Sequence, residues 1–387
     1  MVEHAHKTKV AQTDLDEALG LCTYCPSLCR HACPVATAEG SDTVSPWGMM
    51  SLARHVRAGK VEADADVMRT LRACNGCGAC TNACLHENDV MSALVHVRAD
   101  IVRAKPELAV VAGVSRMAAL ASAGTADVDV GLFSGLGARS RYEERPAVSL
   151  VPGRGALPDA VLQVLSLCDR LDVDALAWGE LARLDLGYDA WFSGDHATFV
   201  ELAKKAHAAS AGARDLVVMS AEALFLLREV YPRFGFSIGA EILHVSEMLL
   251  PLLAGAVVRR VAGRVAYHES CHLSRHLGVR DVPRQVLRRV LVGPLHELPK
   301  RAEITGCCGG TGRTGARTTT TEGMADIILE AATDAGFERL VSFSTECVEA
   351  LRAAQARRVE RGLVLVTQVD HAVGLVAEAV VGDGAAA

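Results

Sequence analysis

The chain has 387 residues, of which 50% are hydrophobic, and a formal net charge of −6 at pH 7. This length allows two or three domains, and the missing long basic run argues against a nucleic-acid partner. The start, MVEHAHKTKV, has no apolar run, and charges such as Glu247 and Asp370 interrupt the most apolar windows. We therefore expect a cytoplasmic chain without a signal peptide or a transmembrane segment.

The N-terminal region contains two tight runs of cysteines. The first run, CTYCPSLCRHACP, supplies Cys22, Cys25, Cys29 and Cys33, and the second run, CNGCGACTNAC, supplies Cys74, Cys77, Cys80 and Cys84. The second run has the C-x2-C-x2-C-x3-C spacing of bacterial ferredoxins, and the first has one more residue between its second and third cysteines. Disulfides are not expected in a chain without a signal peptide.

This spacing predicts two [4Fe–4S] clusters, because three close cysteines can wrap three irons of a cubane. In two-cluster ferredoxins the fourth cysteine of each run ligates the other cluster. We therefore assign cluster one to Cys22, Cys25, Cys29 and Cys84, and cluster two to Cys74, Cys77, Cys80 and Cys33. Two structural zinc sites are the alternative, but zinc knuckles are usually well separated along the chain.

Helices are expected between the two runs. Ser45 can cap a helix that begins at Pro46 and stops near Gly59, and a second helix is expected from about Asp64 to Arg72. Residues 14–100 thereby resemble the α-helical ferredoxin domain of the iron–sulfur subunits of fumarate reductase and succinate dehydrogenase.

From about residue 106 onward, short apolar strands alternate with helical stretches, as in VDVGLF, ALPDAVLQVLSLC and DLVVMS. After Arg260 the order recurs in GRVAYH, DVPRQVLRRVLV and ERLVSF. The alternation predicts α/β layers with parallel strands, and the recurrence predicts two copies of one unit. The segments from Leu216 to Arg228 and from Leu340 to Arg352 share the frame L-V-x-x-S-x-E-[A/C]-x-x-x-L-R.

The second copy has cysteines where strands are expected to end. Cys271 follows VAYHES, Cys307 and Cys308 lie in GCCGGTGRTG, and Cys347 ends VSFSTEC. Segments at the ends of parallel strands converge on one crevice, so four thiolates from three loops can surround one metal centre. Cys168 stands alone and is expected to be a small buried hydrophobic residue.

This cysteine pattern resembles the CCG domain of heterodisulfide reductase subunits. Joined to a two-cluster ferredoxin, the chain is similar to the iron–sulfur subunits of glycolate oxidase, lactate utilisation and anaerobic glycerol-3-phosphate dehydrogenase systems. The resemblance implies two CCG domains after the ferredoxin, and electron transfer with a flavoprotein partner. Ser344 stands where the first cysteine of a heterodisulfide-reductase C-x2-C pair would be, which favours one cubane or a zinc ion over a non-cubane cluster.

The first copy lacks the cysteines of this pattern. Aligning the copies sets Leu136 opposite Cys271, the Ala177–Trp178–Gly179 segment opposite Cys307 to Gly309, and Ala223 opposite Cys347. The side chains of these replacements offer no thiolate, so we expect no metal in this copy. We expect Trp178 to be a buried plug that touches Leu136 and Ala223 or lies close to them.

Three histidines lie close to Cys271 in the sequence: His268, His272 and His276. A metal ligand, a hydrogen bond to a cluster sulfide and a proton acceptor are possible roles, but a solvated or helix-facing role is favoured for each. The glycine-rich segment Gly309–Gly315 lacks the ending of a phosphate loop, and no dinucleotide fingerprint follows a strand. The sequence therefore predicts neither a flavin nor a nicotinamide on this chain.

These patterns together predict an α/β protein with an N-terminal α-helical ferredoxin domain (1–106), a degenerate CCG-like domain without metal (107–256) and a CCG domain with a four-cysteine metal site (257–387). The expected function is an iron–sulfur electron-transfer subunit between a flavoprotein dehydrogenase and an acceptor such as quinone, attached to the inner membrane only through a quinone-reactive partner. The alternatives are a heterodisulfide-reductase-like catalytic subunit and a non-catalytic scaffold with zinc in the last domain.

Overall fold

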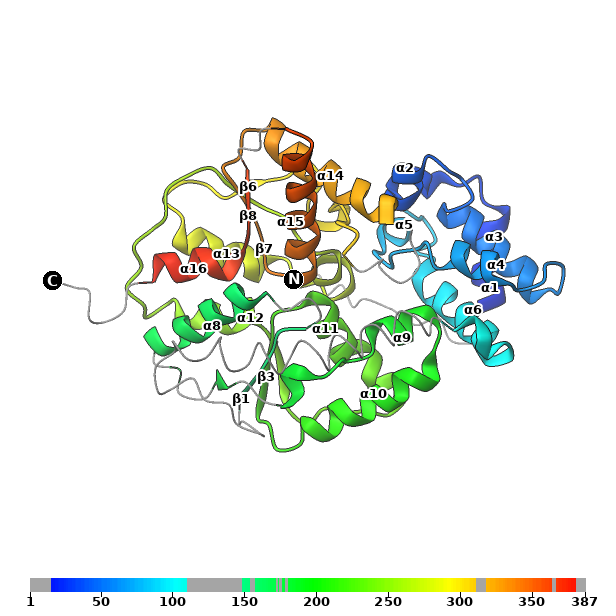
Figure 1. Ribbon diagram of the computed structural model, residues 1–387, viewed down its shortest axis with the longest axis horizontal. Helices are drawn as coiled ribbons and strands as arrows, with labels where there is room; N and C mark the ends of the chain where they lie inside the picture. The colour runs from blue at the N-terminus through cyan, green and yellow to red at the C-terminus, as the bar shows by residue number, and fades with distance from the viewer. Residues whose placement is uncertain are drawn as a thin grey trace.

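The computed structural model describes residues 15–109, 148–153, 157–171, 173, 176–177, 180–310, 318–363 and 367–380. Within these ranges the chain forms a helical N-terminal part and two parallel β-sheets, as the sequence predicts (Figure 1). The helical part lies at one end of the molecule, and the two sheets with their helices make up the rest.

The helical part contains helices of both α and 3-10 type. They are α1 (Leu15–Tyr24), η2 (Leu28–Ala32), α2 (Pro34–Glu39), α3 (Pro46–Arg57), α4 (Ala65–Leu71), α5 (Ala79–Asn82), α6 (Val90–Ala104) and η3 (Pro106–Leu108). The helix signals read from the sequence are confirmed in α3 and α4. The Ser45 side chain accepts from Gly48 N, and the Asp64 side chain accepts from Val67 N.

The first sheet has the strand order β2-β1-β3-β4, and all its strand pairs are parallel. Its strands are β1 (Val148–Val151), β2 (Leu176–Ala177), β3 (Asp215–Val218) and β4 (Glu241–His244). Its helices are α8 (Pro158–Arg170), η4 (Glu180–Arg183), α9 (Tyr188–Ser193), α10 (His196–Ala209), α11 (Ala221–Phe225), η5 (Leu226–Val230), η6 (Tyr231–Phe234) and α12 (Val245–Leu252). The strand expected in VDVGLF lies outside the described residues.

The second sheet repeats this topology, with the order β6-β5-β7-β8 and parallel pairs throughout. Its strands are β5 (Val265–Tyr267), β6 (His296–Glu297), β7 (Arg339–Ser342) and β8 (Gln368–His371). Its helices are η7 (His272–His276), α13 (Asp281–Val290), η8 (Ala302–Ile304), α14 (Thr318–Asp334), α15 (Thr345–Glu360) and α16 (Ala372–Ala379). We refer below to the elements β1–α12 as the first repeat and to β5–α16 as the second repeat.

The frame common to Leu216–Arg228 and Leu340–Arg352, called the shared phrase below, occupies the same place in both repeats. It begins in the third strand of each sheet, β3 or β7, and continues into the following helix. Arg228 Nε donates to Ile242 O at 2.9 Å, and Arg352 Nε donates to Val369 O at 3.0 Å, so each arginine binds its own edge strand. The internal duplication that the sequence predicts is therefore present in the fold.

The two repeats pack reciprocally. Helix α8 of the first repeat contacts α16 of the second, and α12 of the first contacts α13 of the second. One continuous hydrophobic core runs through both repeats. A second core holds the helical part and includes Cys271, Cys307 and Met324, so the helical part shares its interior with the second repeat. No helix in the described part of the chain is long and apolar enough to cross a membrane.

Candidate metal centres

The two N-terminal cysteine runs lie on short helices and the loops between them. Cys22 is in α1, Cys29 is in η2, and Cys33 caps α2, where its sulfur accepts from Ala36 N at 3.5 Å. In the second run the backbone turns at Gly76 and Gly78, whose φ angles of 64° and 69° are unfavourable for any residue with a Cβ. A Cβ on Gly76 would also lie 2.7 Å from Phe192 Cε2. Local glycine geometry therefore shapes the second cysteine loop.

We refer to the two predicted ligand sets as the first group (Cys22, Cys25, Cys29 and Cys84) and the second group (Cys33, Cys74, Cys77 and Cys80). Burial is the main cause of the raised pKa of Cys22, and the nearby thiols of Cys29, Cys84 and Cys25 raise it further. Burial likewise raises the pKa of Cys33, and the thiols of Cys77 and Cys74 add to this effect. These neighbours are compatible with the crossed assignment, but Cys80 also feels the charge of Cys29, so the assignment stays a prediction.

A cavity at the second group shows that the donors suit a cluster. Cys33, Cys74, Cys77 and Cys80 all line it, together with Gly76, Gly78 and apolar side chains. Burial raises the pKa of Cys22 and of Cys33 to about 12, so neither thiol ionises readily without a metal. Iron–sulfur clusters supply the positive charge that stabilises such thiolates. The residues present fit two [4Fe–4S] clusters.

The four C-terminal cysteines are all buried, with 4% of each residue exposed. Cys271 lies between β5 and η7, and Cys307 and Cys308 lie in the loop after η8. Cys347 was expected to end a strand, but it lies in the first turn of α15, because β7 already stops at Ser342. These segments follow β5, β6 and β7, whose carboxyl ends lie at the same edge of the sheet, and a shared metal centre there stays a prediction.

The C-terminal cysteines make two sets of close contacts. The side chains of Cys347 and His268 lie close enough to Cys308 to influence its pKa. The ligand atoms of these three residues lie within 4.8 Å of one another. The side chains of Cys271 and Cys77 likewise lie close enough to Cys307 to influence its pKa, and Cys77 belongs to the second N-terminal group. The candidate third centre therefore adjoins the second cluster group directly.

Arg275 joins the helical part to the second repeat at this point. Its Nε donates to Cys77 O at 2.5 Å, and its Nη1 donates to Thr305 O at 2.7 Å. Burial would lower the pKa of Arg275, but the negative charge of nearby thiolates, Cys77 and Cys271 first among them, outweighs this effect and raises it. A buried guanidinium beside two cysteine groups stabilises negative charge on both of them.

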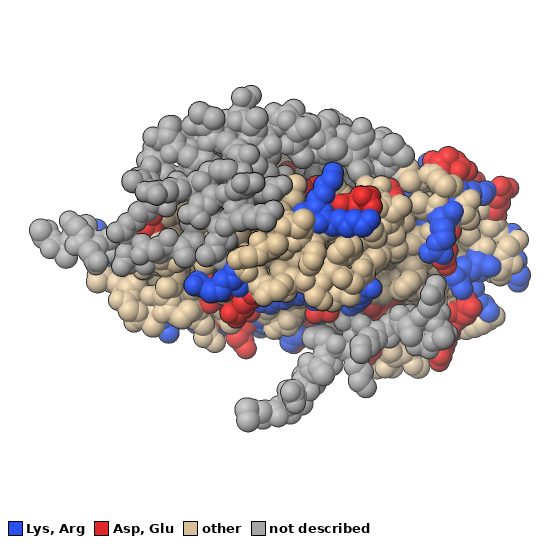
Figure 2. Space-filling view, turned by 90° about the horizontal axis from the view of Figure 1, so that it is seen from below, with Lys and Arg blue, Asp and Glu red and all other residues tan. Residues whose placement is uncertain are grey.

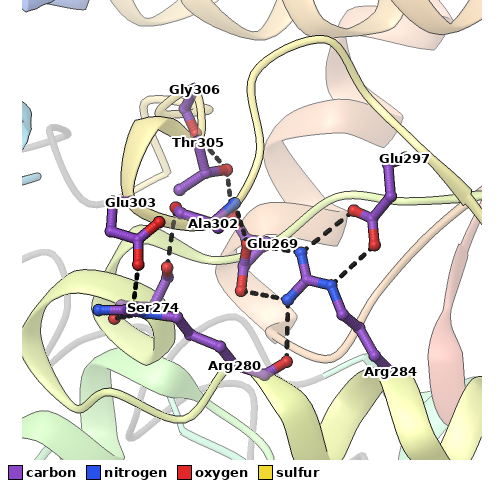
Figure 3. A network of polar contacts seen from close by, with 9 residues as sticks. All are labelled: Glu269, Ser274, Arg280, Arg284, Glu297, Ala302, Glu303, Thr305 and Gly306. Atoms are coloured by element: carbon purple, nitrogen blue, oxygen red, sulfur yellow. Dashed lines mark hydrogen bonds and ion pairs between the residues drawn. The ribbon is translucent and has the colours of Figure 1, made fainter. Parts of the chain in front are cut away.

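A buried ionic network holds the loop that leads to Cys307 (Figure 3). Arg284 binds Glu269 through two parallel hydrogen bonds of 2.7 and 2.9 Å, and it also binds Glu297 at 2.7 Å. Glu269 accepts in addition from Ala302 N at 2.6 Å, and its carbonyl accepts from Thr305 Oγ1 at 2.9 Å. The network thus ties the end of β5 and helix α13 to the segment that precedes the two adjacent cysteines.

The histidines near Cys271 are not solvated, contrary to one of the favoured expectations. His268 and His272 are each 1% exposed, and His276 is 8% exposed. His272 Nε2 lies 3.0 Å from Tyr188 Oη, and His276 Nε2 lies 2.7 Å from Gly76 O. Two of the three therefore connect separate parts of the fold, and His268 lies beside Cys308. Arg275 was not expected at the site, and its one signal in the sequence is its place among these histidines in CHLSRH.

The alignment of the first repeat onto the cysteines needs correction at two places, the counterparts of Cys271 and of Cys307. In the first sheet Ser149 of β1 pairs with Ala177 of β2 and with Leu216 of β3. In the second sheet Ala266 of β5 pairs in the same way with His296 of β6 and with Leu340 of β7. Ala177 therefore corresponds to His296 and not to Cys307. The same registers make β1 the counterpart of β5, so Leu136 is too early in the chain to match Cys271.

Leu136 and Trp178 lie outside the described residues, and so does the contact expected between them. Ala223, opposite Cys347, is buried at 5% exposure, as expected for an apolar replacement. Helix α9 supplies a different aromatic cluster, formed by Tyr188, Trp191 and Phe192, and Phe225 of α11 packs against Trp191. Cys168 is buried at 3% exposure, which confirms the expectation of a small hydrophobic residue.

Two family models match the chain. Residues 18–88 match the 4Fe-4S dicluster domain, and residues 265–352 match the cysteine-rich CCG domain. The first interval contains both N-terminal cysteine runs, and the second contains all four C-terminal cysteines. The two matches agree with the family resemblance drawn from the cysteine spacing.

Several curated proteins are similar to parts of the chain. The EtfAB:quinone oxidoreductase of Syntrophomonas wolfei is 33% identical over 104 residues, 26% of this chain and 14% of that protein. A dihydromethanophenazine:CoB–CoM heterodisulfide reductase subunit of Methanosarcina mazei is 35% identical over 86 residues, 21% of each chain. The probable iron-sulfur-binding oxidoreductase FadF of Bacillus subtilis is 30% identical over 124 residues, 31% of this chain and 17% of that protein. The matched segments thus cover 14% to 21% of these three relatives.

Proposed function

We propose that this chain, which joins a 4Fe-4S dicluster domain to a CCG cysteine-rich domain, is an iron–sulfur electron-transfer subunit of a multi-subunit oxidoreductase. Its expected division is a ferredoxin domain to about residue 106, a CCG-like domain without metal to about 256, and a CCG domain to the end. The donor is the reduced flavin of a partner dehydrogenase. The acceptor is a quinone, which takes up two electrons and two protons to become a quinol.

One observation carries this proposal: neighbouring cysteine groups lie close enough for their charges to interact, Cys29 with Cys80 and Cys77 with Cys307. The partly exposed group of Cys22 lies at one end. The group of Cys74 and Cys77 follows, and Cys77 contacts Cys307 of the last domain. Clusters held at these thiols would supply one-electron storage, since iron–sulfur centres change charge one electron at a time. A continuous series of this kind suits electron transfer better than three unrelated structural sites.

The chain's own residues would set the properties of such centres. Arg275 places a buried positive charge beside Cys77, Cys271 and Cys307, and Arg98 is a second one whose charge acts on Cys74. Arg98 is fully buried and donates to Phe192 O at 2.7 Å. Hydrogen bonding, net charge and solvent exposure tune the reduction potential of iron–sulfur centres. Buried cations next to the second group favour its reduced form.

The partner would approach the exposed end of the series. Charges of both signs are interspersed over the described face in Figure 2, with broad uncharged areas between them. This pattern supports a protein partner more than a nucleic acid. Two of the relatives, the EtfAB:quinone oxidoreductase and the heterodisulfide reductase subunit, are themselves redox proteins.

A specific observation favours zinc as the third centre. The ligand atoms of His268, Cys308 and Cys347 lie within 4.8 Å of one another. Ligands of one tetrahedral zinc ion lie about 3.8 Å apart, given Zn–S bonds of about 2.3 Å. The alternative third centre is a cubane cluster, which the set of four cysteines would suit. With zinc, the last domain would be a scaffold for the two N-terminal clusters.

Metal analysis of the anaerobically purified chain tests the proposal. Two cubanes and a zinc ion give eight irons and one zinc per chain, whereas three cubanes give twelve irons and no zinc. Stopped-flow mixing with a reduced flavoprotein, followed by EPR, then tests electron uptake. A chain that carries no iron, or whose clusters are not reduced by any low-potential donor, would overturn the proposal.

A further inference from the structure

The helix that carries Cys347 is bonded to the first repeat at the residues just before the cysteine. Ser220 Oγ donates to Glu346 Oε1, Ala221 N donates to Ser344 Oγ at 3.3 Å, and Thr345 Oγ1 donates to Pro152 O at 3.3 Å. Ser344, Thr345 and Glu346 are each at most 3% exposed. The three residues that precede Cys347, from the N-cap of α15 onward, are therefore buried and bonded to the repeat that lacks the cysteines.

The two copies of the shared phrase use their serines differently. In the first repeat the Ser220 side chain accepts from Ala223 N at 2.9 Å and so caps its own helix, α11. In the second repeat Ser344 is the N-cap of α15, but its side chain makes no capping hydrogen bond. Ser344 Oγ instead donates to Glu346 Oε2 at 2.7 Å. The start of α15 thus depends on contacts with the first repeat where an ordinary helix would use its own cap.

We infer that the first repeat positions Cys347, with Ser220 acting through Glu346. A buried carboxylate is costly unless hydrogen-bond donors satisfy it, so the donors fix where it lies. Ser220 and Ser344 donate to the two oxygens of Glu346. Glu346 immediately precedes Cys347 in the first turn of α15. Fixing this carboxylate fixes the direction in which the thiol of Cys347 points.

Glu346 also lies against the loop of Cys308, because Gly310 of that loop packs closely on the Glu346 backbone. A Cβ on Gly310 would lie 2.6 Å from Glu346 O, so only glycine fits there without displacing the backbone. Gly310 N in turn donates to Cys308 Sγ at 3.5 Å. Glu346 is thus held between the first repeat and the cysteine loop, and a shift of Glu346 moves Cys347 relative to Cys308.

This role explains why the first repeat keeps the phrase without its cysteine. The phrase supplies Ser220 and the backbone of Ala221, and both reach into the second repeat. The inference rests on the proposed function only in that it takes Cys308 and Cys347 as metal ligands. The geometry of the contact does not depend on which metal is bound.

The test compares Ser220→Ala and Glu346→Ala with the conservative variant Glu346→Gln in the full-length chain. Two readouts are used: the rate at which a chelator removes metal from the third centre, and the alkylation rate of Cys347 by iodoacetamide, read by mass spectrometry. Asp195→Ala is the matched control, because the Asp195 side chain caps α10 of the same repeat by accepting from Thr198 N at 3.1 Å. The Asp195→Ala variant therefore loses a comparable helix cap, but on α10 and not on α11.

We expect both alanine variants to raise the two rates by roughly tenfold or more, because a hydrogen bond to a charged group is lost. Glu346→Gln keeps an acceptor for Ser220 and should recover most of the wild-type rates. Asp195→Ala should match the wild type. Unchanged rates in Ser220→Ala, or an equal rise in Asp195→Ala, would overturn the inference. If Glu346→Ala does not fold, Ser344→Ala removes the Ala221 contact and must show the same direction.

Failure of the proposed function gives a different result. A wild-type chain without any third metal contradicts the metal-centre proposal, yet Cys347 alkylation still reports the position of its thiol. Protected Cys347 in the wild type and reactive Cys347 in Ser220→Ala would then support the positioning role alone. Equal reactivity in both chains would overturn it.

Discussion

Arg275 Nε donates to the carbonyl oxygen of Cys77 at 2.5 Å, across 198 positions of sequence. This contact joins a loop of the helical part to the turn that follows Cys271. The same guanidinium reaches Thr305 O at 2.7 Å and Glu303 O at 3.2 Å. One buried side chain thereby fixes the distance between the second cysteine group and the candidate third centre, and it places a full positive charge between them.

Arg275→Gln should lower the reduction potential of the cluster at Cys77. Removing a buried positive charge disfavours the added electron, by roughly 60 mV for each 1.4 kcal/mol of lost stabilisation in a one-electron couple. Arg275→Lys keeps the charge and should shift the potential less. An EPR-monitored redox titration gives both values. Lys204→Gln, on the exposed face of α10, is the control and should leave the potential unchanged.

Cys33→Ser should damage the cluster held by Cys74, Cys77 and Cys80 and spare the one held by its sequence neighbours. Cys33 lines the cavity of that second group. Iron analysis and EPR of the reduced chain should show one intact cluster. Cys168→Ala, which alters a buried cysteine of α8, should retain both. Loss of the signal from the cluster at Cys22 would contradict the crossed arrangement.

Arg284→Gln should cost about 3–5 kcal/mol of unfolding free energy, because it leaves the buried carboxylate of Glu269 without its partner. The Arg284 and Glu269 side chains are 9% and 1% exposed. Arg280→Gln is the matched control on the adjacent turn: its partner, Glu303, is 49% exposed, so about 1 kcal/mol or less is expected. Urea unfolding followed by circular dichroism measures both. Similar costs for the two variants would argue against a central role for the network.

The stability of the contact between the repeats should fall in acid. Burial lowers the pKa of His244 and of His371 to about 3, where the ordinary value is 6.5. Both are neutral in the folded chain, and Nε2 of His244 lies 3.2 Å from Phe343 O. The unfolded chain takes up the protons below pH 6.5, so the stabilisation is full above 6.5 and is lost as pH falls toward 3. Each histidine contributes a slope of about 1.4 kcal/mol per pH unit.

Most of the charged groups around these two histidines lower their pKa values further, and Asp159 only partly opposes this effect. Arg228 lowers the pKa of His244 further, and Asp159 opposes the effects of His244 and Arg352 on His371. The double variant His244→Asn, His371→Asn keeps polar caps on α12 and α16 but cannot take up the protons. Its thermal midpoint should depend less on pH between 6.5 and 4.5 than that of the wild type. Parallel curves would show that other groups set the acid limit.

Tyr24 and Leu85 should contribute to binding of the electron donor. They are 77% and 92% exposed, and they neighbour Cys25 and Cys84 of the first cluster group. Large exposed apolar side chains around a redox centre favour a protein contact. The variant Tyr24→Ser, Leu85→Ser should raise the KM for a reduced flavoprotein several-fold and leave the iron content unchanged. Val257→Ser, Val359→Ser, which alters side chains 63% and 60% exposed, is the control. A KM that rises equally in the control would point to a general surface effect.

The sequence by itself determined the local chemistry. The spacing of Cys22 to Cys33 and of Cys74 to Cys84 specifies short loops that present thiols together, and the caps at Ser45 and Asp64 specify where the linking helices begin. The shared phrase specified the duplication, because its strand and helix signals are local and recur in the same order. These features depend on residues close together in the chain, so one sequence is enough to predict them.

Only the tertiary structure decided which distant residues meet. Strand register made Ala177 the counterpart of His296 and not of Cys307, because register depends on pairing between strands that are distant in the chain. Packing of the repeats brought Ser220 to Glu346, and docking of the helical part brought Arg275 to Cys77. Such contacts depend on how whole layers bury their apolar faces against one another, and a serine or an arginine looks the same in sequence whether it faces solvent or a buried partner.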